Sequence, residues 1–180
     1  MQEQGAKEKN GHPEPSEEKT EKNKTDIIEA DADKIIMKHV YVSLGVGLIP
    51  IPFLDFVGVS GVQLNMMRKL AQIYNIPFSK DMVKNLIGAL IGGAFPASAG
   101  PLIASSFAKM VPGIGHALGL VGASGISGAC TYAIGKVFSR HFAEGGTFLS
   151  FDPENAREFY EEMFREGRDM VSEIKNRKTK

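Results

Sequence analysis

Charged residues collect at the two ends of the chain, and long stretches without charge fill its middle. Residues 1–25 are polar and have no apolar periodicity. Such a segment cannot bury enough apolar surface to offset the entropy lost on ordering. The sequence therefore predicts a disordered polar tail over residues 1–25, for which simple solvation is favoured over a docking role.

Apolar residues at helical spacing begin near Thr25 or Asp26 and continue into an uncharged stretch that ends at Leu54. Pro50 and Pro52 interrupt this stretch. Proline lacks a backbone donor and disfavours helical geometry in the residue before it, so the first helix ends here.

A second helix is expected from Leu54 or Asp55 to Tyr74. The carboxylate of Asp55 then lies near the positive end of the helix dipole, where it can cap free N–H groups. We favour this capping role over a functional one for Asp55. Asn75 tolerates the left-handed conformation that ends many helices, so the second helix is expected to end there. The two helices, joined at the Pro50–Pro52 break, form a first predicted hairpin.

Two longer stretches without charge follow, at residues 85–108 and 111–135. Their lengths of 24 and 25 residues exceed the roughly 20 residues that cross a bilayer. A Pro-Gly turn between them predicts a second, glycine-rich hairpin. Pro96 and Pro101 break its first arm, and its hydropathy is marginal, so spanning, re-entrant and soluble-bundle forms all stay open.

Glycine is frequent in this second hairpin, although each interior glycine costs a helix in water about 1 kcal/mol relative to alanine. Glycines four residues apart let helix backbones approach closely inside a membrane. The helix-packing candidates are Gly88, Gly92, Gly115, Gly119 and Gly122.

Residues 147–180 predict an amphipathic helix that packs on the preceding domain, residues 26–146. Asp152 is its expected cap and Pro153 its first residue. Acidic residues dominate its first turns and basic residues its last, as the helix dipole favours. The predicted fold class is therefore all-α: two glycine-rich helical hairpins and a C-terminal amphipathic helix, preceded by a disordered tail.

Overall charge is balanced, with 21 basic and 21 acidic residues, which gives no electrostatic case for nucleic acid as a partner. The single cysteine cannot form an internal disulfide, and no signal peptide is expected at the start of the chain. Basic residues flank both hairpins at their bases. This pattern predicts a bacterial inner-membrane location with both termini cytoplasmic.

No catalytic, cofactor or metal chemistry is predicted. The segment ending in Gly135 and Lys136 superficially matches a phosphate-binding loop, but Cys130 replaces a required glycine and Val137 a required hydroxyl residue. Histidines are not spaced with Cys, Asp or Glu as metal ligands are. His116 is read as a helix-contact residue in preference to a proton carrier.

The motif Pro50-Ile-Pro52-Phe-Leu-Asp55, followed by Gln63 and Tyr74, resembles the domain-of-unknown-function-697 family. The resemblance covers about residues 30–143, with Asn75 where the family commonly has glycine. It implies a bacterial membrane-associated helical module that occurs alone or behind small GTP-binding domains. A separate GTPase is thus allowed as a partner, although no residue here points to one.

We therefore expect a non-enzymatic membrane module that contacts lipid and self-associates through its glycine faces. A small channel or carrier, built on the helix breaks, is one alternative. A soluble helical bundle that binds lipid is the other.

Overall fold

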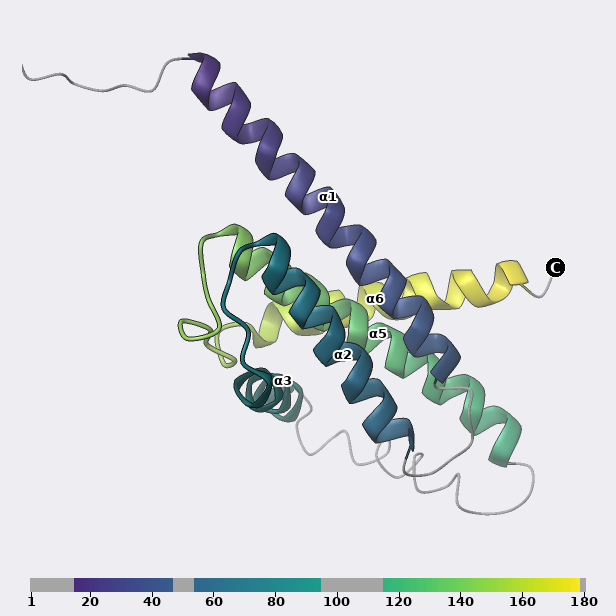
Figure 1. Ribbon diagram of the computed structural model, residues 1–180. Helices are drawn as coiled ribbons and strands as arrows, with labels where there is room; N and C mark the ends of the chain where they lie inside the picture. The colour runs from purple at the N-terminus through teal and green to yellow at the C-terminus, as the bar shows by residue number, and fades with distance from the viewer. Residues whose placement is uncertain (1–14, 47–53, 95–114, 179–180) are drawn as a thin grey trace, which may run out of the picture.

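The computed structural model describes residues 15–46, 54–94 and 115–178, which contain five helices and no strand. The helices are α1 (Pro15–Val46), α2 (Leu54–Ile73), α3 (Lys80–Ala94), α5 (Gly115–Ala143) and α6 (Arg157–Lys178), as Figure 1 shows. The all-α prediction is confirmed.

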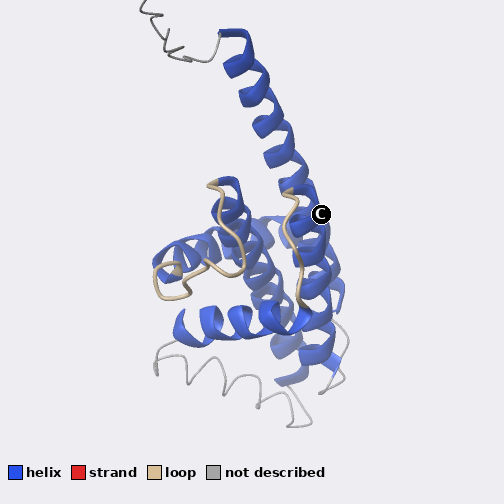
Figure 2. Cartoon of the chain, turned by 60° about the vertical axis from the view of Figure 1, so that its left-hand side comes forward, coloured by secondary structure: helices blue, strands red, loops and turns tan. Residues whose placement is uncertain are grey.

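Helix α5 is the centre of the molecule, because α1 and α6 both pack along it and α2 also contacts it. Ile36 of α1 lies against Gly135, and Leu44 lies against Gly128, so α1 and α5 run antiparallel. Helix α6 also runs against the direction of α5, because Phe159 near its start lies beside Arg140 and Val171, further along, lies beside Gly128. Figures 1 and 2 show the helices as one bundle. Helix α3 crosses the others and contacts α2 and α6.

Three glycines set the spacing between these helices. A Cβ atom added at Gly135 would lie 2.7 Å from Ile36 Cγ1, and one at Gly128 would lie 2.9 Å from Leu44 Cδ2. On α6, a Cβ atom at Gly167 would lie 3.1 Å from the backbone Cα of Ala129. The backbones of α1 and α6 can approach α5 this closely only because these positions lack side chains.

Helix α1 begins at Pro15, so the part of the predicted disordered tail that follows this residue is helical instead. Residues 1–14 of that tail lie outside the described residues. Segment 16–24 is rich in glutamate and lysine, which have high helix propensity, and Pro15 suits the first helical position. The start of α1 projects beyond the bundle in Figure 1.

The predicted end of the second helix is confirmed. Asn75 has a φ of 56°, and the N–H of Ile76 donates to the carbonyl of Ala71 at 2.7 Å. This is the Schellman arrangement, which satisfies carbonyls that a helix end leaves free. Gly145, with a φ of 85°, ends α5 in the same way.

Aromatic side chains fill the core where α2 and α5 end and the α5–α6 connection folds back. Phe138 stacks on Phe151 with ring centroids 4.2 Å apart, and Phe142 meets Phe148 edge-on at 5.0 Å. Tyr74 extends this cluster from the end of α2. The rings fix the α2–α3 turn against the end of α5 through burial and favourable ring geometry.

One helix boundary and one packing arrangement differ from the sequence expectation. The α-helix α6 starts at Arg157, because residues after Asp152 first form a separate turn. Asp152 does cap this turn, with its Oδ1 accepting from the N–H of Glu154 at 2.9 Å. Helices α3 and α5 of the second predicted hairpin pack mainly on other partners, α3 on α2 and α6 and α5 on α1 and α6.

We predict opposite effects for two alanine substitutions. Gly135→Ala crowds the branched side chain of Ile36, and such overpacking costs about 1–3 kcal/mol, more than the gain in helix propensity. Gly88→Ala meets nothing within 4 Å, so it should stabilise the fold by up to about 1 kcal/mol. Thermal unfolding followed by circular dichroism measures both. A higher melting temperature for Gly135→Ala would contradict the close-packing role.

Candidate functional site

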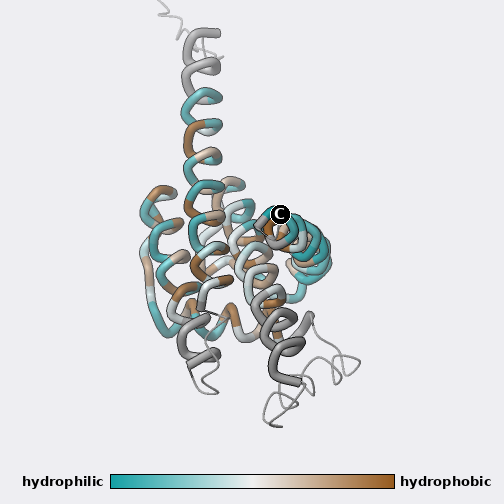
Figure 3. The backbone as a smooth tube through the Cα atoms, turned by 90° about the vertical axis from the view of Figure 1, so that its right-hand side faces the viewer, coloured by the Kyte–Doolittle hydropathy of each residue, from teal (hydrophilic) through white to brown (hydrophobic). Residues whose placement is uncertain are grey.

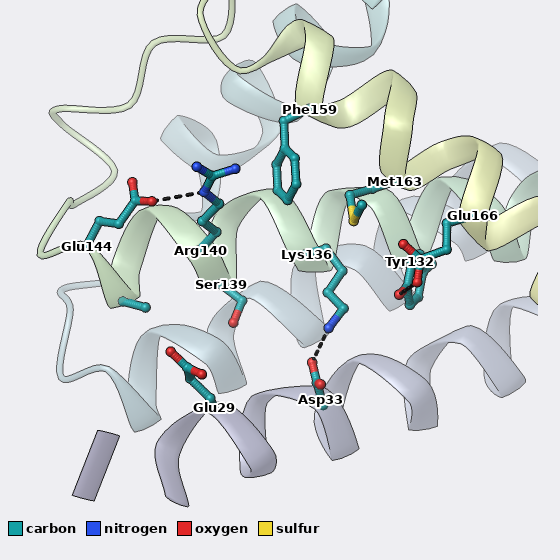
Figure 4. Close-up of a pocket in the computed structure, with 11 residues that line it drawn as sticks. Glu29, Asp33, Tyr132, Lys136, Ser139, Arg140, Glu144, Phe159, Met163 and Glu166 are labelled. Atoms are coloured by element: carbon teal, nitrogen blue, oxygen red, sulfur yellow. Dashed lines mark hydrogen bonds and ion pairs between the residues drawn. The ribbon is translucent and has the colours of Figure 1, made fainter. Parts of the chain in front are cut away.

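A groove of about 450 Å³ lies between α1, α5 and α6. Helix α5 forms its floor, and the acidic side of α1 and the start of α6 form its walls, as Figure 4 shows. Its lining residues are Glu29, Asp33, Tyr132, Lys136, Ser139, Arg140, Ala143, Glu144, Phe159, Met163 and Glu166.

Most charges in the groove are already engaged by neighbours. Lys136 Nζ donates to Asp33 Oδ1 at 2.7 Å and so ties α5 to α1. Arg140 pairs with Glu144 at 2.9 Å, and its guanidinium lies 4.6 Å from the ring centroid of Phe159 on α6. Exposed ion pairs contribute little to stability, so these contacts mainly fix orientation.

Tyrosine hydroxyls join α5 to its neighbours. Tyr132 donates to Glu166 Oε1 at 2.7 Å, and Tyr74, which directly follows α2, shares a 3.0 Å hydrogen bond with Ser139. Burial, followed by the hydrogen bond to Glu166, raises the pKa of Tyr132, so its phenol stays neutral. Burial also raises the pKa of the Cys130 thiol to about 11, so the thiolate is scarce at neutral pH. These groups hold helices together and lack the lowered pKa of an activated nucleophile.

A second region is defined by the absence of charge. Residues 39–46 of α1, 56–67 of α2 and 115–135 of α5 contain no Asp, Glu, Lys or Arg. We call these three segments the uncharged end. The helix ends at Val46, Leu54 and Gly115 lie together at one end of the molecule in Figure 1. In Figure 3, hydrophilic residues instead dominate helix α6 and the coloured turns of α1 that lie beyond the bundle.

Apolar side chains are exposed on α1 within this uncharged end. Tyr41 is 51% exposed and Val42 is 45% exposed. One turn before them lies Lys38, which is exposed, and Lys69 lies nearby on α2. The region thus passes from basic to apolar within one helical turn.

His39 joins α1 to α2 at this transition. Its Nδ1–H donates to the carbonyl of Ile35 at 2.7 Å, because a carbonyl can only accept, and its Nε2 therefore accepts from Asn65 Nδ2 at 3.1 Å. This is the neutral form of the ring. Burial, and to a lesser extent the charges of Lys69 and Lys38, lowers the pKa of His39.

The predicted motif residues fall in different places. Pro50 and Pro52 lie outside the described residues. Asp55 is the second residue of α2, as expected for a residue near the helix start. Gln63 is buried on α2, and Tyr74 is half-buried beside Ser139. The latter two therefore support the packing of α2.

Two of the predicted packing glycines make no close contact with another helix of the chain. Gly88 and Gly92 are exposed on α3, and an added Cβ atom at either would meet nothing within 4 Å. Gly115, Gly119 and Gly122 belong to α5, but the structure does not describe their surroundings. A role for these glycines between copies of the chain stays a prediction.

Sequence reasoning missed the glycines that do pack helices together. Gly128 and Gly135 are seven residues apart, which places both on the face of α5 that meets α1. Gly167 interrupts the apolar stripe of α6, between Met163 and Val171. A small residue within a stripe of large ones is the signal that could have identified it.

None of the helices in the described parts of the chain combines the length and the apolar character needed to cross a membrane. Helix α3, expected to begin a spanning stretch, has 15 residues and ends at Ala94. The rest of that stretch, residues 95–108, lies outside the described residues.

The fold and the uncharged end define an all-α module with one apolar, charge-free end. The family model for Domain of unknown function (DUF697) matches residues 14–169, and the chain belongs to this family. It is similar to Magnetosome membrane protein 22 of Magnetospirillum gryphiswaldense, with 34% identity over 147 residues. This match covers 82% of the chain and 75% of the relative. No solved structure matches the chain.

We predict that His39 makes stability depend on pH. Its folded pKa is below the ordinary value of 6.5, so its contribution is complete above pH 6.5 and is lost as pH falls toward the folded pKa. His39→Gln removes this titration. The free energy of unfolding from urea titrations at several pH values should therefore fall less in the variant between neutral and mildly acidic pH. Equal pH dependence in both proteins would exclude this role.

Proposed function

We propose that this protein is a non-enzymatic, membrane-associated helical module that docks its uncharged end onto a lipid bilayer. The charged parts, namely α6 and the projecting start of α1, remain in water. Three helices carry their charge-free segments to the same end of the molecule, and this is the observation that carries the proposal.

Energetics favour this orientation. Exposed apolar side chains such as Tyr41 and Val42 gain free energy when a membrane removes them from water, at about 25 cal/mol per Å² buried. Charged side chains lose free energy in the hydrocarbon region, by roughly 2.5–3.5 kcal/mol each at its centre. A molecule with these groups at separate ends therefore binds a bilayer with one end only. The membrane protein named among its relatives supports the same assignment.

The finer assignments are part of the proposal. We assign the bilayer to the bacterial inner membrane and the docked surface to its cytoplasmic leaflet, because basic residues flank the charge-free stretches in the sequence. Docking of one end leaves both termini on the cytoplasmic side. We assign a scaffold role because the Lys136–Asp33 and Arg140–Glu144 ion pairs in the groove join parts of the protein to each other. A separate GTPase partner rests on the family resemblance alone.

We predict that charge introduced into the uncharged end prevents membrane binding. The variant Val42→Glu/Gly61→Glu places two carboxylates at exposed positions there. The matched control Ile27→Glu/Leu149→Glu places them at exposed positions elsewhere, since Ile27 is 55% and Leu149 is 84% exposed. In flotation with phosphatidylcholine vesicles, the wild type and the control should float, and the first variant should remain at the bottom.

Other results separate the alternatives. If the wild type does not float and is monodisperse without detergent, the membrane proposal fails and the soluble lipid-binding bundle is favoured. If the first variant floats like the control, binding does not use the uncharged end. A channel or carrier predicts ion flux across the same vesicles, which a docking scaffold does not produce.

Self-association is tested on α3. Gly88→Leu/Gly92→Leu should reduce the oligomer size in detergent, because leucine would separate helices that glycine lets touch. Both positions are open within one chain, so the monomer fold should be unaffected. Light scattering after size-exclusion chromatography measures the mass. An unchanged mass would show that this face of α3 is not an interface between copies.

A further inference from the structure

Two lysines border the uncharged end, namely the exposed Lys38 on α1 and the half-buried Lys69 on α2. Lys38 follows Lys34 by one helical turn, and Lys34 is paired with Asp31 at 2.9 Å. Neither Lys38 nor Lys69 makes an ion pair with any residue that the structure describes. Their charges are therefore available to an external anion.

The two lysines belong to one surface. His39, adjacent to Lys38, is hydrogen-bonded to Asn65, and Lys69 follows Asn65 by one turn of α2. Both ammonium groups are close enough to His39 to act on its ring electrostatically. Acidic neighbours on α1 are engaged elsewhere, since Asp31 pairs with Lys34 and Asp33 pairs with Lys136.

Between these lysines and the uncharged end, the exposed side chains change from charged to apolar. Tyr41 and Val42 are exposed three and four residues after Lys38 on α1. On α2, Asn65 and Gly61 are exposed one and two turns before Lys69. A helix rises about 5.4 Å per turn. Along α1, the ammonium of Lys38, the phenol ring of Tyr41 and the apolar side chain of Val42 therefore follow one another within about 10 Å toward the uncharged end. This sequence matches the layers of a membrane surface, where tyrosine is enriched at headgroup depth.

We propose that the surface formed by Lys38, Lys69, Tyr41 and Val42 recognises the headgroups of anionic lipids. The lysines contact lipid phosphates, and Tyr41 and Val42 enter the region below them. This inference rests on the proposed membrane docking and adds a preference for anionic over neutral lipid. It also fixes the depth of insertion at the turn between Lys38 and Tyr41.

Flotation of the full chain with two vesicle types tests the preference. Phosphatidylcholine vesicles with phosphatidylglycerol should bind the wild type more tightly than phosphatidylcholine alone, and salt should reduce this difference. Lys38→Gln/Lys69→Gln should weaken binding to the anionic vesicles about thirtyfold, the effect of losing two lysines at a membrane surface. It should leave binding to neutral vesicles unchanged. Lys80→Gln/Lys84→Gln removes the same charge from α3 and should have little effect.

Insertion depth is measured separately by fluorescence. The chain contains no tryptophan, so Tyr41→Trp introduces a single reporter. Its emission should shift to shorter wavelength with anionic vesicles, whereas that of Leu149→Trp should not. Circular dichroism checks that every variant keeps its helices.

The remaining outcomes distinguish failure of the headgroup site from failure of the proposed membrane docking. No preference of the wild type for anionic vesicles, or equal loss in both lysine variants, overturns the headgroup site while docking through the uncharged end stands. An unshifted spectrum for Tyr41→Trp on vesicles that bind overturns the stated depth. Failure of the wild type to bind either vesicle type overturns the proposed function itself.

Discussion

The close approach of α1 and α6 to α5 at three glycines determines the rest of the structure. Gly128 and Gly135 admit the large residues of α1, and Gly167 brings α6 against the backbone of α5. Dispersion contacts depend steeply on distance, so these approaches add many small attractions over the lengths of the helices. Between α1 and α5, the buried hydroxyls of Ser43 and Thr131 satisfy each other at 2.8 Å.

The same contacts determine where the charge-free segments lie. Because α1 is antiparallel to α5, its uncharged second half lies beside the uncharged first half of α5. The carboxylate of Asp33 and the ammonium of Lys136 meet at the opposite end of this interface. The antiparallel packing of α1 and α5 thus separates the charged residues from the charge-free segments along the molecule.

Local signals in the sequence predicted local structure well. Asn75 identified the end of α2, because few other residues adopt a positive φ at low cost. The start of α1 was placed too late, because apolar periodicity cannot detect a helix whose residues face water all round. The choice of partner helix was also beyond local patterns. Gly88 and Gly128 look alike in sequence, yet only the second meets another helix in the chain.

The candidate surfaces differ in how far they could be anticipated. Absence of charge in the central segments was visible in the sequence, whereas their gathering at one end required the packing of α1 on α5. The groove could not be predicted, because Asp33 and Lys136 are 103 residues apart. Tyr74 was identified from its motif, but its hydroxyl bond to Ser139 on another helix depends on tertiary structure.

The projecting start of α1 has a geometric consequence. From Lys22 to Asp31 its side chains are exposed, apart from the half-buried Ile28. A helix rises 1.5 Å per residue, so Pro15 is held about 25 Å beyond Ala32, the first buried residue among those that the structure describes. An exposed helix of this kind has the geometry of a semi-rigid spacer. Inserting one residue into it would rotate whatever precedes Pro15 by about 100° around the helix axis, whereas inserting a full turn would mainly change its distance from the bundle.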